Sequence, residues 1–125
     1  MRQKDIYFMH LGGAQSVGRS CYYLRLGQSN ILLDCGLQRI NGATCSPDFR
    51  SLLTSQFMES IQQLDHVYIS HAHTDHVGYL PQLMQIAPQA SVYMTLQTKQ
   101  LAEYRLIANS SQTGAAEASR LLSNV

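Results

Sequence analysis

The sequence predicts an α/β fold, in which a mixed β-sheet is flanked by helices, on the basis of three observations. Strand-like apolar runs occur before, between and after segments whose apolar residues recur at helical spacing. The continuous apolar run Ile31-Leu32-Leu33 is typical of a strand buried on both faces. With 125 residues and 45% hydrophobic content, the chain is one domain or part of one.

The opening of the chain is expected to form an antiparallel meander. Strands are predicted over Ile6–Leu11, Ser20–Leu26 and Asn30–Asp34. The segment Gly27–Asn30 has the length and residue types of a hairpin turn between the second and third strands. The segment Gln38–Asp48 holds an Asn-Gly and a Ser-Pro dipeptide and is predicted to be a loop.

The remainder alternates helices with strands. Helices are predicted over Phe49–Gln63, Gly78–Ile86 and Leu96–Asn109, strands over Asp65–Ser70 and Ser91–Met94, and a last helix over Ala115–Leu122. Asp48 or Ser46 is expected to cap the first helix, and Thr95 or Thr98 the third. Pro81 fits the second helix if it lies in the first turn.

The residues that carry chemistry follow the strand Asp65–Ser70, in the order His71-Ala72-His73-Thr74-Asp75-His76. Neutral imidazole and carboxylate are both zinc ligands. In an extended segment residues two apart point to the same side, so His71 and His73 can bind one ion. If a helix follows, Asp75 and His76 turn in another direction and reach a second ion. Two ions roughly 3.5–4 Å apart are the arrangement with which hydrolases activate a water and hold a leaving oxygen.

Composition and charge exclude several other classes. The net charge of +1 gives no electrostatic footprint for nucleic acid. The odd number of cysteines, without a C-x-x-C pair, indicates neither a disulfide framework nor a cysteine-zinc site; they are Cys21, Cys35 and Cys45. Buried thiols and the absence of a visible signal peptide or a ~20-residue apolar segment lead us to expect a cytoplasmic protein without a membrane partner.

Four stretches together resemble a known family. His71–Gly78 resembles the H-x-H-x-D-H signature of the metallo-β-lactamase superfamily, and Leu32–Gly36 resembles its first motif, an aspartate that closes a strand. Leu11–Cys21 is similar to the opening of the β-CASP branch, which Val92–Lys99 also fits. That branch includes the endonuclease subunit of the cleavage and polyadenylation machinery, its archaeal and bacterial relatives, and ribonuclease J. The resemblance covers about Ile6 to Ser110.

The resemblance implies a fold and a set of site residues. The fold is a four-layer αββα sandwich of two similar halves, of which this chain would be one. His71 and His73 would bind a first zinc ion, and Asp75 and His76 a second, which makes Asp75 and His76 the implied catalytic residues. Asp34 would accept a hydrogen bond that orients the site; the alternative is an ordinary turn carboxylate.

Other residues near these motifs have less specific assignments. Arg19 is either a phosphate contact or an ordinary surface arginine, and His10 and His66 are expected to be structural. Three glycines of the opening motif either let backbone pass close to the metals or are ordinary loop glycines: Gly12, Gly13 and Gly18.

The resemblance also implies that residues 1–125 are the amino-terminal part of a metallo-β-lactamase domain. Further ligands of the superfamily, including a third metal-binding histidine, are expected beyond it, because no histidine follows His76. The whole protein would be a ribonuclease in which a hydroxide held by two zinc ions attacks the RNA phosphodiester. The fragment alone is expected to be inactive. The alternatives are a thioester or lactone hydrolase of the same fold and a non-catalytic scaffold subunit.

Half of a sandwich leaves the inner face of its sheet without the second sheet. Ile31, Leu33, Val67 and Ile69 lie in strand-like apolar runs that predict cover on both sides. A large exposed apolar patch drives association. The fragment is therefore expected to pair with a second copy as a two-fold dimer.

Overall fold

A computed structural model of the chain describes residues 6–12, 19–40 and 43–108. Within these ranges it describes no side chain for residues 39, 40, 44, 74, 75 and 104–108. The predicted helix Ala115–Leu122 and two of the loop glycines, Gly13 and Gly18, lie outside the described residues. None of the described helices is long and apolar enough to cross a membrane.

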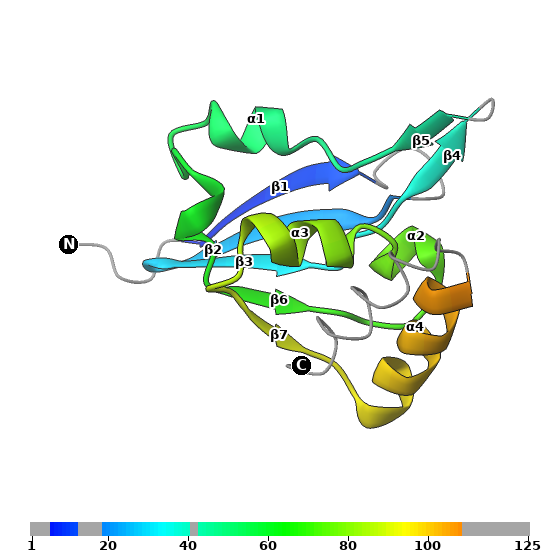
Figure 1. Cartoon of the computed structure of the whole chain (residues 1–125). Helices are drawn as coiled ribbons and strands as arrows, with labels where there is room; N and C mark the ends of the chain where they lie inside the picture. The colour runs from blue at the N-terminus through cyan, green and yellow to red at the C-terminus, as the bar shows by residue number, and fades with distance from the viewer. Residues whose placement is uncertain (1–5, 13–18, 41–42, 109–125) are drawn as a thin grey trace.

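Five strands form one mixed sheet in the order β1-β2-β3-β6-β7 (Figure 1). The strands are β1 (Ile6–Gly12), β2 (Cys21–Leu26), β3 (Ser29–Leu33), β6 (His66–Tyr68) and β7 (Ser91–Tyr93). The first three are antiparallel, and β6 and β7 run parallel to β3. The α/β fold class and all five strands are therefore as predicted. The turn between β2 and β3 contains Gly27 at a φ of 60°, in the left-handed region where glycine carries no steric penalty.

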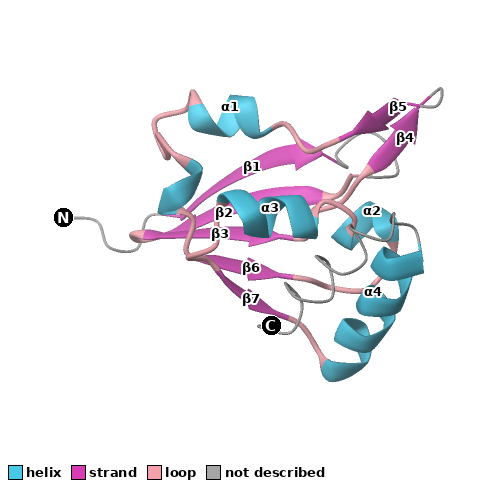
Figure 2. Cartoon of the chain, viewed as in Figure 1, coloured by secondary structure: helices cyan, strands magenta, loops and turns pink. Residues whose placement is uncertain are grey.

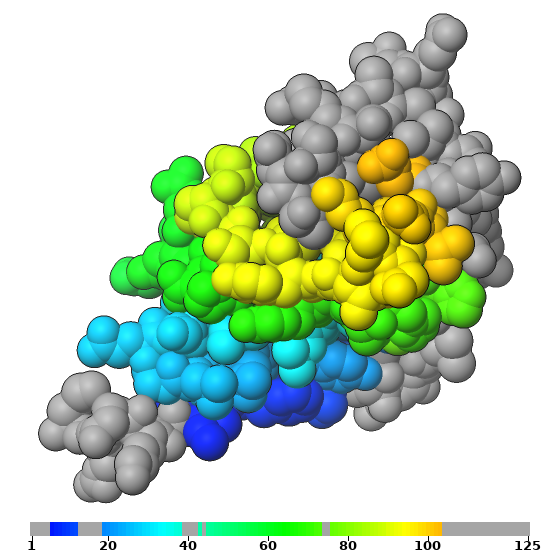
Figure 3. Space-filling view, turned by 90° about the horizontal axis from the view of Figure 1, so that it is seen from below, coloured from blue at the N-terminus to red at the C-terminus, as the bar shows by residue number. Residues whose placement is uncertain are grey.

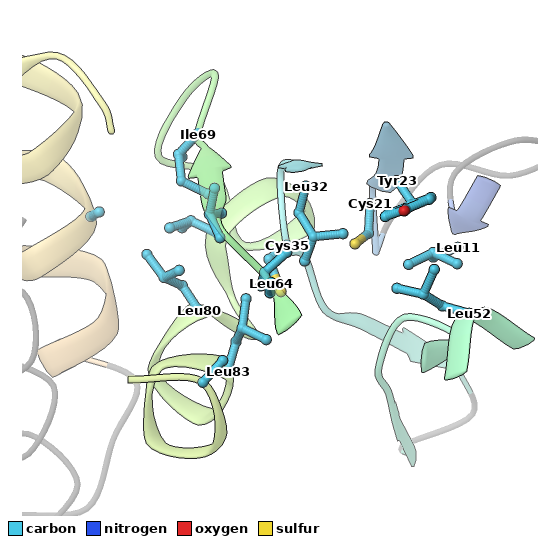
Figure 4. Packing of buried hydrophobic residues seen from close by; sticks show 14 of the residues in the cluster. Leu11, Cys21, Tyr23, Leu32, Cys35, Leu52, Leu64, Ile69, Leu80 and Leu83 are labelled. Atoms are coloured by element: carbon cyan, nitrogen blue, oxygen red, sulfur yellow. The ribbon is translucent and has the colours of Figure 1, made fainter. Parts of the chain in front are cut away.

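The helices α1 (Phe49–Leu53) and α3 (Leu80–Ile86) cover one face of this sheet (Figure 1). Burial of leucine side chains between these layers is the main stabilising contribution, at about 2 kcal/mol for each large side chain. Figure 4 shows Leu80 and Leu83 on the side of Leu32 and Ile69, and Leu52 beside Leu11. The core thus lies between the sheet and these helices.

The predicted helix over Phe49–Gln63 is wrong in length, because α1 ends at Leu53. The hydroxyls of Thr54 and Ser55 donate to the carbonyls of Arg50 and Leu52, at 2.9 and 2.6 Å, and such bonds compete with a continuing helix. The apolar periodicity misled because the irregular segment that follows is also packed on the core, where Met58 is buried. A single 3-10 turn, η1 (Ile61–Gln63), ends the segment.

The cap of α1 is Asp48, one of the two predicted candidates. Its Oδ1 accepts a hydrogen bond from the Ser51 backbone N–H at 3.1 Å, and its Oδ2 accepts one from the Ser51 hydroxyl at 2.6 Å. These hydrogen bonds lower the pKa of Asp48, since they favour the charged carboxylate.

The predicted loop Gln38–Asp48 contains a small hairpin instead. Its strands are β4 (Gln38–Ile40) and β5 (Ala43–Cys45), which form a separate two-stranded sheet. The pairing of Ile40 with Ala43 brackets the Asn-Gly dipeptide at residues 41–42. Asn-Gly is the strongest short hairpin signal, so the sequence carried this information.

The later helices lie close to their predicted positions (Figure 2). Pro81 falls in the first turn of α3, where its missing N–H costs no helical hydrogen bond. The last described helix, α4 (Leu96–Ala108), follows Thr95, whose Oγ1 accepts from the Thr98 N–H at 3.1 Å. Thr95 is therefore the capping residue, and Thr98 is not.

The second face of the sheet, which we call the open face, is not covered by the described helices. One cross-strand row on it runs through His10, Tyr22, Leu33, Tyr68 and Tyr93. Tyr68 and Tyr93 stack at 4.9 Å between ring centroids and are 45% and 44% exposed. In Figure 3 the blue and light-blue atoms of β1 and β2 lie at the surface. Ile31, Val67 and Ile69, which were expected to need cover by a second copy, are already buried within this chain, and Leu33 is half-buried. The association stays a prediction.

Candidate metal centre

The parallel pairing of β3 and β6 creates the candidate site. Because the carboxyl ends of parallel strands meet at one edge of a sheet, Asp34 after β3 and Ser70 after β6 lie side by side. The Asp34 N–H donates to the Tyr68 carbonyl at 2.8 Å, and the Cys35 N–H donates to the His76 carbonyl at 2.8 Å. These bonds hold α2 (Thr74–Val77), the helix that follows the first histidines, against the ends of both strands (Figure 1).

Asp34 is the centre of the hydrogen-bond network at this edge. Its φ is 66°, in the left-handed region that aspartate tolerates better than most residues. The carboxylate accepts from the Ser70 N–H at 2.7 Å through Oδ1, and lies 2.8 Å from His76 Nδ1 through Oδ2. Since a carboxylate only accepts, His76 donates its Nδ1–H to Asp34. This geometry is the one that a metal-bound histidine needs.

The three histidine rings of the motif lie together. The ring centroid of His71 is 3.8 Å from that of His76 and 5.1 Å from that of His73. The extended segment predicted for His71 and His73 is absent, because β6 ends at Tyr68 and His73 lies in a bend. The bend leads into α2, where the His73 carbonyl accepts from the His76 and Val77 N–H groups at 2.9 and 3.0 Å. A helix therefore does follow, and it turns His76 back toward His71.

The donors present fit zinc by their chemistry. Imidazole is a ligand type that zinc prefers, and the rings of His73 and His76 both lie close to that of His71. Among the described side chains, no three His, Cys, Asp or Glu residues form a complete group that could hold a metal ion. The side chain of Asp75 lies outside the described part of the chain, so its role as a ligand stays a prediction.

The cysteines near this edge are not suited to bind metal. Cys21 and Cys35 are both fully buried free thiols. Burial raises the pKa of Cys35 well above its ordinary value, and a hydrogen bond to Cys21 acts in the same direction. A thiol binds metal as the thiolate, so a protonated Cys35 beside Asp34 is a packing residue.

The glycine and arginine of the opening motif have a structural role here. A Cβ at Gly12 would overlap the carbonyl oxygen of Arg19, so Gly12 permits a close approach of backbone to backbone. The sequence had left open whether Gly12 lets backbone pass close to the metals or is an ordinary loop glycine. Arg19 lies near enough to Asp48 to lower its pKa, after the larger effect of the hydrogen bonds from Ser51. A phosphate contact by Arg19 stays a prediction.

The two histidines outside the motif pack against aromatic rings on the open face. His10 lies edge-on to Tyr22 at 5.5 Å between ring centroids, and His66 lies 5.7 Å from Tyr93. The residue that sequence reasoning missed is Ser70, which contacts both Asp34 and His71. The only sequence signal was a hydroxyl placed directly before the first histidine.

Comparison with known proteins finds both sequence relatives and structural neighbours. The family model described as the metallo-beta-lactamase superfamily matches residues 16–115. Transcription termination factor FttA of Methanocaldococcus jannaschii is 41% identical over 91 residues, which cover 73% of this chain and 14% of that protein. Integrator complex subunit 11 of Danio rerio is 40% identical over 97 residues, which cover 76% of this chain and 16% of that protein.

The structural neighbours share the fold at low sequence identity. A motif variant of a metallo-beta-lactamase from Cronobacter sakazakii aligns with a TM-score of 0.56 and 23% identity, over 78% of this chain and 34% of that chain. MEM-A1, a subclass B3 metallo-beta-lactamase from a soil metagenome library, aligns with a TM-score of 0.53 and 19% identity, over 81% and 34% of the two chains. The chain therefore spans a small part of its sequence relatives and about a third of these structures.

Proposed function

The chain belongs to the metallo-β-lactamase superfamily, and we propose that it is the amino-terminal part of a zinc-dependent ribonuclease of the β-CASP branch. The observation that carries this proposal is the contact of Asp34 with His76, beside the ring of His71, at one edge of the sheet. The relatives support the RNA-processing direction, since one is named a transcription termination factor and another an Integrator complex subunit. The β-CASP resemblance of the opening motif agrees with these relatives.

In this proposal His71 and His73 hold one zinc ion, and Asp75 and His76 hold a second. When bound, the ions would supply Lewis acidity and lower the pKa of a water to about 7. The part played by this chain is to orient the imidazoles, which Asp34 does for His76 by taking its Nδ1–H. Catalytic zinc normally has three protein ligands. In this proposal residues 1–125 form the amino-terminal part of a metallo-β-lactamase domain, and the remaining ligands would come from other parts of that domain.

The test is RNA cleavage by a longer protein that carries the rest of the domain. Replacing His76 with alanine is expected to reduce single-turnover cleavage of a labelled single-stranded RNA at least 100-fold, because a metal ligand is lost. RNA binding should change little, since phosphate contacts elsewhere supply most of the affinity.

The control is Ser51→Ala, which removes an exposed hydroxyl that bonds to Asp48 at the start of α1 and should leave cleavage unchanged. Residues 1–125 alone, at enzyme excess, are expected to bind zinc weakly and leave the RNA intact. Near-normal turnover by the His76→Ala protein, or metal-dependent cleavage by residues 1–125, would contradict the assignment. If the protein were a thioester or lactone hydrolase, neither the unmodified longer protein nor its variants would cleave RNA. A non-catalytic scaffold would turn over no substrate.

We further propose that residues 1–125 alone self-associate through the open face. Phe8 on this face is 53% exposed, and it stacks on Tyr22 at 5.7 Å between ring centroids. Exposed aromatic side chains on the outer strands of this face are costly in water, and a second copy related by a two-fold axis would cover them. Within the longer protein the second half of the sandwich would take that place.

Sedimentation at micromolar concentration measures this association. Phe8→Glu is expected to shift the chain from dimer to monomer, because it places a charge within the buried interface. Leu101→Glu is the control, since Leu101 is 56% exposed and lies on α4, not on a strand of the sheet. A stable monomer of the unmodified chain would show that the open face needs no cover.

We also propose that the protein is cytoplasmic, which its buried free thiols support.

A further inference from the structure

Ser70 occupies a position between two histidines that the proposed function assigns to different metal ions. Its backbone N–H donates to Asp34 Oδ1 at 2.7 Å, and its hydroxyl donates to Asp34 Oδ2 at 2.8 Å. The same hydroxyl oxygen lies 3.0 Å from His71 Nδ1. Asp34 Oδ2 also receives the Nδ1–H of His76. One carboxylate is therefore linked to His76 directly and to His71 through a single hydroxyl.

Counting the hydrogens in this series of hydrogen bonds shows which ring nitrogen of His71 is protonated. A serine hydroxyl has one hydrogen and two lone pairs. Its hydrogen is directed to Asp34 Oδ2, so only a lone pair is available toward His71. A hydrogen bond at 3.0 Å then requires that His71 Nδ1 carries the hydrogen and donates it. In a neutral His71 ring, Nε2 then carries the lone pair that can bind a metal ion.

We propose that Ser70 is a positioning residue that selects the Nδ1–H tautomer of His71 and thereby prepares its Nε2 to bind zinc. The identification of the bound ion as zinc rests on the proposed function. The tautomer of His71 rests on the hydrogen bonds alone. Through Asp34, Ser70 joins the ligand of the first ion to the ligand of the second. The two sites are thus oriented by one network at the shared end of β3 and β6.

The first measurement uses the unmodified chain. With ¹⁵N-labelled histidine, at a pH well above the ordinary imidazole pKa of about 6.5, NMR distinguishes the protonated ring nitrogen from the unprotonated one. His71 is expected to be protonated at Nδ1. Protonation of His71 at Nε2 in this spectrum overturns the inference without any variant.

The second measurement compares variants by the same spectrum and by zinc titration. Ser70→Ala is expected to release His71 to a tautomer mixture and to weaken zinc binding about tenfold, as loss of an outer hydrogen-bond partner typically does. Ser70→Thr keeps the hydroxyl and should restore both properties. The matched control is Ser51→Ala, because Ser51 makes the same pair of bonds to Asp48, through N–H at 3.1 Å and hydroxyl at 2.6 Å. This control should change neither the His71 spectrum nor the zinc affinity.

The outcomes separate this inference from the proposed function. If zinc binds but Ser70→Ala changes neither the tautomer nor the affinity, the role of Ser70 is wrong and the proposed function stands. If the unmodified chain binds no zinc but Ser70→Ala still changes His71 from the Nδ1–H tautomer to a mixture, the metal assignment is wrong. The positioning of His71 by Ser70 is then still supported.

Discussion

Replacing Asp34 with glycine is expected to weaken zinc binding about 100-fold and to lower the free energy of unfolding by about 3 kcal/mol. Glycine accepts the φ of 66° at this position, so the change isolates the effect of the carboxylate. The Ser70 N–H and the His76 Nδ1–H both lose their acceptor. Because Asp34 orients His76 directly and His71 through Ser70, the loss of affinity should exceed that of Ser70→Ala. Zinc titration and denaturant unfolding of residues 1–125 measure the two effects.

Asp65→Ala is the matched control for Asp34→Gly. Asp65 Oδ2 also accepts a hydrogen bond from a backbone N–H, that of Asn30, at 2.8 Å. Asp65 precedes β6 and Asp34 follows β3, so the two carboxylates lie at opposite ends of this parallel pair. The control is expected to cost about 1 kcal/mol of stability and to leave zinc affinity unchanged. Equal losses of zinc affinity in both variants would mean that Asp34 acts only through the stability of the fold.

Replacing Gly12 with alanine is expected to destabilise the chain by about 3 kcal/mol, at the upper end of the cost of overpacking. The new Cβ would overlap the carbonyl oxygen of Arg19, and backbone cannot swing away as a side-chain end can. Arg19 itself has a φ of 39°, which leaves it little freedom to adjust. The measurement is the free energy of unfolding by denaturant.

Gly27→Asn is the comparison for Gly12→Ala, because Gly27 needs its left-handed φ and asparagine tolerates that region. This substitution is expected to lower the free energy of unfolding by much less than Gly12→Ala does. If Gly12→Ala were as mild as Gly27→Asn, the ends of the opening loop would not be held in contact as the structure shows.

The sequence alone determined the family, the α/β class and the mixed sheet. Strand positions were predictable because alternating and continuous apolar runs report which backbone faces are buried, as Leu32 and Val67 show. The histidine motif was identifiable because its donors lie within six consecutive residues, at His71 to His76. Local signals also limited the cap of α1 to Ser46 or Asp48 and allowed Pro81 in the first turn of α3. In each case the information lies within a few residues along the chain.

Tertiary structure decided what depends on residues far apart in sequence. Helical spacing could not show that α1 stops at Leu53, because the irregular segment after it is packed on the same core as a helix would be. Nor could spacing show that Gly12 makes room for the backbone of Arg19. The network at the site required the parallel pairing of β3 with β6, which brings Ser70 to Asp34 across 36 positions of sequence. The sequence alone does not reveal the role of the Ser70 hydroxyl, because that role depends on the Asp34 carboxylate that the strand pairing brings into contact with it.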